Sequence, residues 1–178
     1  MKHVPLFFLI IVSFFACNQS PSGRTNISLN GEWQLATSAD LSSKPAFYDT
    51  TCPVPGLVDL AVPSAPHTQT SDRIYWYKRT FPTSNESFDI CHLKINKAKY
   101  HTRVFVNEQF AGENPYSFTP TELDITSFLK PSGETNEILI AVGCRNNLPA
   151  NVSDGNDFEK DYYFPGIYDD VKLIFTAA

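Results

Sequence analysis

Apolar and polar residues alternate along much of this 178-residue chain with the two-residue period of a β-strand. Val171, Leu173 and Phe175 share one face of the segment 170–175, and the stretch 77–81 alternates in the same way. Segments of this kind are rich in β-branched and aromatic residues, which favour strands. The strands expected from the pattern are 27–36, 74–81, 87–95, 101–107, 136–144 and 170–175.

The spacing of these segments indicates how they assemble. Prolines are frequent between them, as expected for loops, because proline cannot donate a hydrogen bond to a neighbouring strand. Strands with a single apolar face are typical of antiparallel sheets that cover a core on one side. The pattern therefore predicts an all-β fold, an antiparallel two-sheet sandwich or jelly roll of about eight strands over 27–178. Only 119–129 has a helical pattern, of one or two turns.

The first sixteen residues have the pattern of an export signal. A short basic start precedes a nearly unbroken apolar run, 4–15, which is too short to span a bilayer and has the length of a signal-peptide core. Ala16 directly before Cys17 resembles the cleavage site of a bacterial lipoprotein, where the cysteine is acylated. We therefore expect an exported protein, anchored in the bacterial envelope (outer membrane or periplasm) by a lipid on Cys17, with 17–26 as a flexible tether. Ordinary secretion with an unmodified Cys17 is the alternative.

Composition narrows the classes of function. The formal net charge is −5 and no basic run occurs, which argues against nucleic-acid binding. The other cysteines, Cys52, Cys91 and Cys144, are odd in number, so a disulfide framework is not expected, although one pair stays possible. No cysteine and histidine spacing resembles a zinc site, and no cofactor is predicted.

Five stretches, in this order along the chain, resemble the N-terminal sugar-binding domain of glycoside hydrolase family 2, the family of β-galactosidases, β-glucuronidases and β-mannosidases. They are LNGEWQLA (29–36), VPGLVDLA (54–61), YWYKRTF (75–81), the long stretch 98–129, and GIYDDVKLIF (166–175). Each stretch alone is weak evidence for the family, but all five in the order of the family are a specific signal. The resemblance implies a jelly roll like that of galactose-binding domains, placed beside a catalytic (β/α)₈ barrel.

Two positions depart from the family pattern. Glu108 stands where the hairpin after Val-Asn usually has glycine, so we expect a longer turn with Gly112 as its flexible position. Asp169 stands where the closing Gly-Ile-Tyr strand is usually followed by arginine, which reverses a charge near the expected barrel interface.

The resemblance also bears on catalysis. Family 2 enzymes are retaining glycosidases, which use two carboxylates about 5–5.5 Å apart. In the family, both lie on a barrel of about 250 residues, and the length of this chain is taken up by strands. The resemblance therefore implies a domain truncated or split from its barrel, with no catalytic residues and no glycosidase activity of its own.

The segment before the closing strand carries candidate binding carboxylates. Asp157, Glu159 and Asp161 alternate, so an extended backbone would place them on one face with about 6.6 Å between successive residues. That spacing could hold a cation such as calcium; a solvated acidic loop with Lys160 as counter-charge is the alternative. In the family, an acidic residue of this loop can reach the active site of the barrel, and Asp161 is the matching position.

Aromatic rings are the other candidates. Tyr116, Tyr162 and Tyr163 lie in expected loops, where a ring could stack on a sugar or face a partner. A sandwich of this size also needs aromatic rings in its interior. The rings expected there are Trp33, Trp76, Phe81, Phe105 and Phe175.

Three functions fit the sequence. The first is a carbohydrate-binding and scaffold domain of a family 2 glycosidase that breaks down β-glycosides, with carbohydrate and the barrel as partners. The second is a stand-alone, lipid-anchored carbohydrate-binding module. The third is a structural or interaction domain of the envelope without sugar affinity.

Overall fold

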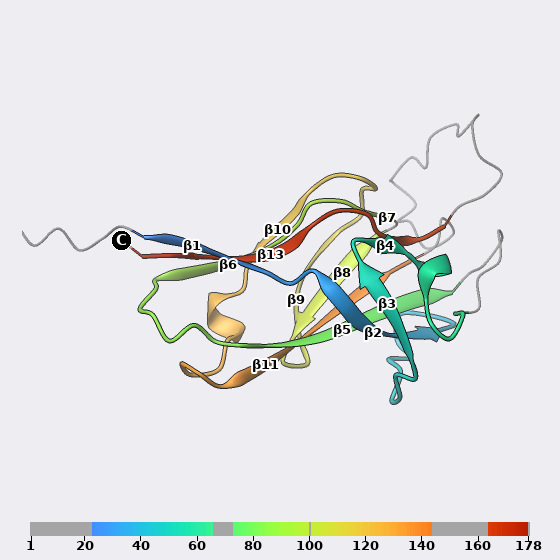
Figure 1. The fold of residues 1–178 in the computed structure, drawn as a ribbon, viewed down its shortest axis with the longest axis horizontal. Helices are drawn as coiled ribbons and strands as arrows, with labels where there is room; N and C mark the ends of the chain where they lie inside the picture. Colours follow the sequence, from blue (N-terminus) through green and yellow to red (C-terminus); the bar gives the residue numbers. More distant parts are fainter. Residues whose placement is uncertain (1–22, 66–72, 100, 144–163, 178) are drawn as a thin grey trace, which may run out of the picture.

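The computed structural model of the protein describes residues 23–65, 73–99, 101–143 and 164–177. They form an antiparallel β-sandwich, which confirms the predicted fold class (Figure 1). The four-stranded sheet, in the order β1-β13-β6-β10, consists of β1 (Arg24–Ser28), β6 (Ile90–Ile95), β10 (Thr121–Asp124) and β13 (Val171–Thr176). The six-stranded sheet, in the order β3-β2-β5-β11-β8-β9, consists of β2 (Gly31–Ser38), β3 (Thr50–Val54), β5 (Ile74–Pro82), β8 (Thr102–Val106), β9 (Gln109–Asn114) and β11 (Thr135–Val142).

A third, small sheet lies at one end of the sandwich. Its order is β4-β12-β7, and its strands are β4 (Gly56–Leu57), β7 (Ala98–Lys99) and β12 (Gly166–Ile167). The helical content of the described residues is limited to two 3₁₀ turns, η1 (Val58–Leu60) and η2 (Thr126–Phe128). Neither they nor any other described element forms a helix long and apolar enough to cross a membrane.

The main core lies between the two large sheets. Val171, Leu173 and Phe175 of β13 all point into it and are at most 3% exposed, as the alternation predicts. Trp33 and Phe81 lie in the same core, also as expected. This burial of apolar side chains is the dominant stabilising contribution to such a fold.

A second apolar cluster lies on the outer face of the six-stranded sheet. It consists of Ile74 and Trp76 of β5 with Leu139 and Ala141 of β11, and the connection 39–49 between β2 and β3 contributes Leu41 and Tyr48 to it. Trp76 is therefore buried as predicted, but outside the main core. The prediction that Phe105 lies in the main core is wrong, because its ring is only half-buried and packs on this outer cluster. The central strands β5 and β11 are apolar on both faces for this reason.

Two predicted elements differ from the structure. The segment 27–36 divides into β1 and β2, which belong to different sheets, and β1 begins at Arg24, inside the predicted tether. The predicted helix over 119–129 is instead strand β10 followed by the single turn η2. Pairing of β10 with β6 satisfies its backbone groups in the sheet, and this tertiary contact outweighs the local helical preference.

The hairpin between β8 and β9 is tighter than predicted. Val106 pairs with Gln109, so Asn107 and Glu108 alone form the turn, and both have positive φ angles, of 48° and 69°. Gly112 does not take part in the turn. It lies in β9 beside a bulge, where a Cβ atom would be 2.7 Å from Cδ2 of Leu123. Glu108 therefore adopts the left-handed conformation that glycine would adopt at lower cost.

Candidate functional site

The loop end of the sandwich, formed by the small sheet, η1 and the loop 115–120, brings three of the family-like stretches together. Gly166 of β12 pairs with Leu57 of β4 and Lys99 of β7. A Cβ atom on Gly166 would lie 2.6 Å from the carbonyl oxygen of Gly56, so the two backbones approach too closely for any side chain there. Val58 N–H donates to the carbonyl of Pro165 over 3.1 Å, which fixes η1 to the same strand.

The loop 115–120 is held in place by Asn114. Its Nδ2 donates to the Thr119 hydroxyl over 3.0 Å and to the carbonyls of Thr119 and Pro120 over 3.3 and 3.2 Å. Its Oδ1 accepts the N–H of Tyr116 over 3.0 Å. One asparagine side chain thus closes the loop on itself, as asparagine commonly does in turns.

Phe118 connects this loop to the small sheet. Its φ is 59°, and its N–H donates to the carbonyl of Ala98 over 2.9 Å. Its ring meets the ring of Tyr168 edge to face, with 5.1 Å between centroids, and Lys99 Nζ lies 5.1 Å from the centroid of the Phe118 ring. Edge-to-face packing and a nearby cation each stabilise an aromatic ring in a defined orientation.

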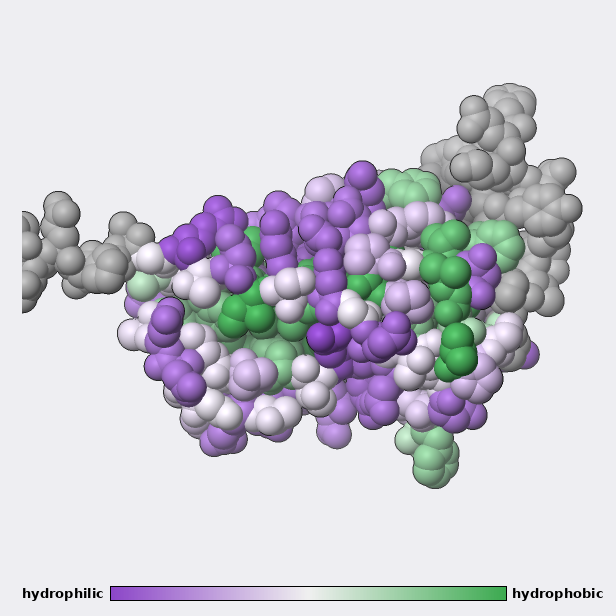
Figure 2. All heavy atoms as spheres, in the orientation of Figure 1, coloured by the Kyte–Doolittle hydropathy of each residue, from purple (hydrophilic) through white to green (hydrophobic). Residues whose placement is uncertain are grey.

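The loop end exposes apolar and aromatic side chains. Tyr116 is 58% exposed, Leu60 52% and Phe118 47%. Figure 2 shows apolar side chains at the surface of this end. Exposed apolar side chains that gather at one end of a domain commonly mark an interaction surface.

Two polar side chains of the loop end, Tyr168 and Asp169, have displaced pKa values. Burial, with the charge of Asp59 as a second cause, raises the pKa of Tyr168 to about 12, and its hydroxyl donates to the carbonyl of Phe164. Asp169, the position of the reversed charge, lies 3.5 Å from Lys97 Nζ. The backbone N–H of Asp170 holds the pKa of the Asp169 carboxyl below its usual value. Tyr168 is therefore a neutral hydroxyl and Asp169 a charged carboxylate at neutral pH.

The structure places only part of the predicted site. Tyr116 is exposed, as expected for a binding ring. The predicted residues that lie outside the described residues are Asp157, Glu159, Asp161, Tyr162, Tyr163 and the lipid-attachment residue Cys17. Sequence analysis missed Phe118 and Lys99, although Phe118 follows Tyr116 by two residues in the same loop.

The described residues hold no cluster of at least three histidine, cysteine, aspartate or glutamate side chains that could bind a metal ion. Four described carboxyl groups have a displaced pKa, and each is lowered; they are Asp40, Glu122, Asp124 and Asp169. A catalytic acid in a glycosidase needs the opposite, a raised pKa. Cys52 and Cys91 are free, buried thiols, and Cys144 lies outside the described residues.

Known proteins share this sequence pattern and fold. Residues 16–177 match the family described as glycosyl hydrolases family 2, sugar binding domain. The chain belongs to this family. The resemblance to the N-terminal sugar-binding domain of glycoside hydrolase family 2 is thereby confirmed.

Relatives in the family are longer proteins. The chain is 31% identical to a β-galactosidase of Priestia megaterium over 93% of its own length and 15% of the relative. It is 27% identical to a β-galactosidase large subunit of Latilactobacillus sakei, over 83% of this chain and 29% of that one. A β-D-glucuronidase of Dictyoglomus thermophilum has the same fold, with a TM-score of 0.64 and 22% identity over 86% of this chain and 28% of that structure. The chain thus spans less than a third of the length of each of these proteins.

Proposed function

We propose that the chain is the non-catalytic carbohydrate-binding and scaffold domain of a family 2 β-glycosidase that breaks down β-glycosides. Its loop end would face carbohydrate and a catalytic barrel, carried on the same polypeptide or on another chain. The observation that carries this proposal is the exposure of Tyr116, Phe118 and Leu60 around a sheet built from the family's glycine motifs. Exposed rings supply flat apolar area for a sugar face or for a partner surface at little cost in conformational entropy.

The order of the loop end supports a docking role. Asn114 and the Phe118–Tyr168 contact fix the loop 115–120 before any partner binds. A preorganised surface loses little conformational entropy on association, which favours binding. The segment with Asp157, Glu159 and Asp161 ends where Phe164 and Pro165 enter this sheet, so we extend the proposal to those carboxylates as sugar or partner contacts.

A chimaera tests the scaffold role. This chain would replace the matching N-terminal segment of the Priestia megaterium β-galactosidase. We expect the chimaera to hydrolyse p-nitrophenyl β-D-galactoside, and we expect the relative without that segment to be inactive. An inactive chimaera whose sandwich still melts cooperatively would contradict the proposal.

Two further measurements sharpen this test. In the chimaera, Tyr116→Ala with Phe118→Ala should reduce turnover at least about fivefold, a loss of about 1 kcal/mol, and Phe47→Ala is the matched control. Phe47 is 86% exposed but belongs to the connection 39–49. The chain alone should not hydrolyse p-nitrophenyl β-galactoside, β-glucuronide or β-mannoside; turnover of any of them would refute the non-catalytic role.

We also propose that the protein is exported and held at the bacterial envelope by a lipid on Cys17. The apolar run 4–15 and the small residue before Cys17 support this. Cys17→Ser should move the protein from the membrane fraction to the soluble fraction. Mass spectrometry of the wild-type N-terminus should show a diacylglyceryl cysteine, and an unmodified Cys17 would refute the anchor.

A further inference from the structure

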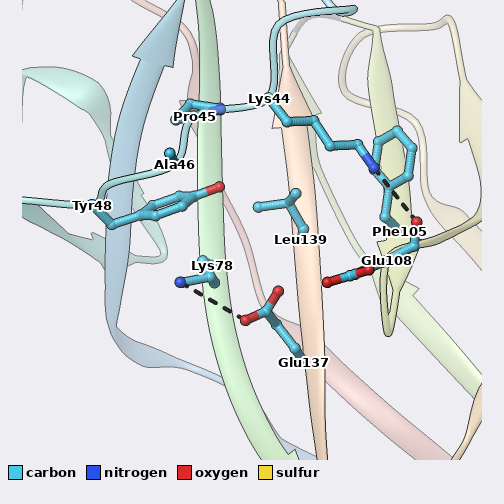
Figure 3. A pocket seen from close by; sticks show the side chains of 9 residues that line it. All are labelled: Lys44, Pro45, Ala46, Tyr48, Lys78, Phe105, Glu108, Glu137 and Leu139. Atoms are coloured by element: carbon cyan, nitrogen blue, oxygen red, sulfur yellow. Dashed lines mark hydrogen bonds and ion pairs between the residues drawn. The ribbon is translucent and has the colours of Figure 1, made fainter.

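A second candidate binding site lies away from the loop end, on the outer face of the six-stranded sheet. There the connection 39–49 and the hairpin β8–β9 border a cleft of about 360 Å³ (Figure 3). Its floor is Leu139 of β11, and its sides are Tyr48 and Phe105. This volume falls at the lower end of the range for small-molecule sites in proteins.

Charged groups of both signs border this cleft. Lys78 Nζ lies 3.8 Å from Glu137 Oε2 and 4.3 Å from the centroid of the Tyr48 ring. Lys44 Nζ lies 3.9 Å from the centroid of the Phe105 ring and 3.5 Å from the carbonyl oxygen of Glu108. Figure 3 shows that the side chain of Glu108, from the β8–β9 hairpin, points toward that of Glu137, which lies on the same strand as Leu139. Two lysines and two glutamates leave the cleft without net charge.

Several of these groups have spare hydrogen-bonding capacity. The ion pair of Lys78 and Glu137 is longer than a hydrogen bond, so both can still bind a ligand hydroxyl. The Tyr48 hydroxyl makes no hydrogen bond within the described residues. Burial, followed by the charge of Glu137, raises the pKa of Tyr48 to about 12, so this hydroxyl stays protonated and can both donate and accept.

The surrounding structure keeps the cleft in shape. Trp76, two residues before Lys78 in β5 and packed in the same outer cluster as Leu139, is fixed by a 2.8 Å hydrogen bond from its Nε1 to the Ser38 hydroxyl, and its ring lies 5.9 Å from that of Phe105. At the start of the connection, Asp40 accepts hydrogen bonds from the N–H groups of Ser42 and Ser43, both over 2.9 Å. A stable floor and an ordered edge favour a defined ligand over random contacts.

We propose that this cleft binds one or two residues of a neutral oligosaccharide. Sugar hydroxyls need donors and acceptors together, which Lys44, Lys78, Tyr48 and Glu137 provide, and the apolar face of a pyranose ring fits the Leu139 floor. A ligand with net charge would leave one pair of charged side chains without compensation. The site rests on the carbohydrate-binding part of the proposed function, and it is separate from the surface proposed to face the barrel.

The experiment is a titration of the ¹⁵N-labelled full chain followed by two-dimensional NMR. The probes are cellotetraose, β-1,4-mannotetraose, β-1,4-galactotetraose and, as a charged probe, tetragalacturonate. We expect at least one neutral probe to shift the amide signals of Lys78, Phe105, Glu137 and Leu139. Glu137→Gln should then weaken binding at least fivefold.

The matched control is Glu122→Gln. Glu122 pairs with Lys94 across β10 and β6, over 3.0 Å and with similar exposure, but on the other sheet. The Glu122→Gln variant should change the affinity for the neutral probe less than twofold, and both variants should have the melting temperature of the wild type. Equal effects of the two variants, or preference for tetragalacturonate, would overturn the proposal.

The remaining outcomes separate this site from the proposed function. Shifts confined to the amide signals of 115–120 and 166–168 would overturn the proposed cleft site and would support sugar binding at the loop end. If no probe shifts any amide signal, the proposal that the cleft binds sugar is overturned. The scaffold role is then tested by the chimaera alone. A failed chimaera together with shifts in the cleft would support a carbohydrate-binding module without a barrel.

Discussion

Replacing Asn136 with alanine should destabilise the sandwich strongly, although no functional surface contains this residue. Asn136 is the second residue of β11 and is fully buried. Its Oδ1 accepts the N–H of Lys130 over 2.9 Å and Nδ2 of Asn107 over 2.8 Å, and its Nδ2 donates to the Thr83 hydroxyl over 2.7 Å. One side chain therefore joins the β8–β9 turn, the end of β5 and the segment before β11.

The loss of stability depends on the hydrogen bonds that the partners of Asn136 keep after the substitution. Asn107 retains a bond to the carbonyl of Phe128, and the Thr83 hydroxyl retains one to the carbonyl of Lys130. The substitution removes the three hydrogen bonds of the buried Asn136 side chain, each of which contributes about 0.5–1.5 kcal/mol to stability. We expect Asn136→Ala to lower the free energy of unfolding by about 2–4 kcal/mol and Tm by about 5–15 °C.

Urea unfolding followed by tryptophan fluorescence measures this change. Asn85→Ala is the control, because Asn85 is exposed and only accepts a 3.2 Å hydrogen bond from Ser132; we expect less than about 0.5 kcal/mol. Asn107→Ala combined with Asn136→Ala should be less destabilising than the sum of the single changes, since the two residues share a hydrogen bond. A loss below about 0.5 kcal/mol for Asn136→Ala would refute the assigned network.

Three further predictions concern stability. Gly166→Ala should cost about 1–3 kcal/mol in a thermal melt, because its Cβ would lie 2.6 Å from the backbone oxygen of Gly56; an unchanged melt contradicts the close approach. Glu108→Gly should stabilise the protein by about 0.5–1 kcal/mol in urea, because φ is 69° there, and a destabilised variant would show that the side chain outweighs backbone strain. Burial raises the pKa of Cys52 from 9.0 to about 11 and that of Cys91 to about 12, so the folded state holds these protons more tightly than the unfolded state. Stability from both thiols is complete below about pH 9 and is lost as the pH rises through about 11 and 12, and a variant with both cysteines replaced by alanine should show a flatter decline.

The sequence predicted β6, β8 and β13 from the alternation of apolar and polar residues, and β5 and β11 from their β-branched and aromatic residues, although both faces of these two strands carry apolar side chains. It failed where tertiary contacts decide the outcome. β9 and β10 carry weak apolar patterns, and pairing with β8 and β6 makes them strands. The division of β1 from β2 depends on Asn30, whose side chain bonds Asp170 and the N–H of Val171, at the far end of the sequence.

The candidate site was harder to predict than the fold. Tyr116 could be recognised from its loop position, but the role of Phe118 depends on Tyr168, fifty residues later. The outer cleft requires the connection 39–49 to fold back over β5 and β11, and no local pattern indicates that contact. Residues that act together across strands are visible only when the register of the sheet is known.

The pairing of β1 with β13 has a mechanical consequence. Arg24 pairs with Thr176, and the N–H of Ala177 donates to the carbonyl of Gly23 over 3.0 Å, so the two ends of the described chain lie side by side, far from the loop end (Figure 1). Tension applied between these ends would load the ladder one hydrogen bond at a time, which is peeling and not shear. The first and last strands should therefore separate at low force, and the domain would yield to pulling while its loop end remained folded.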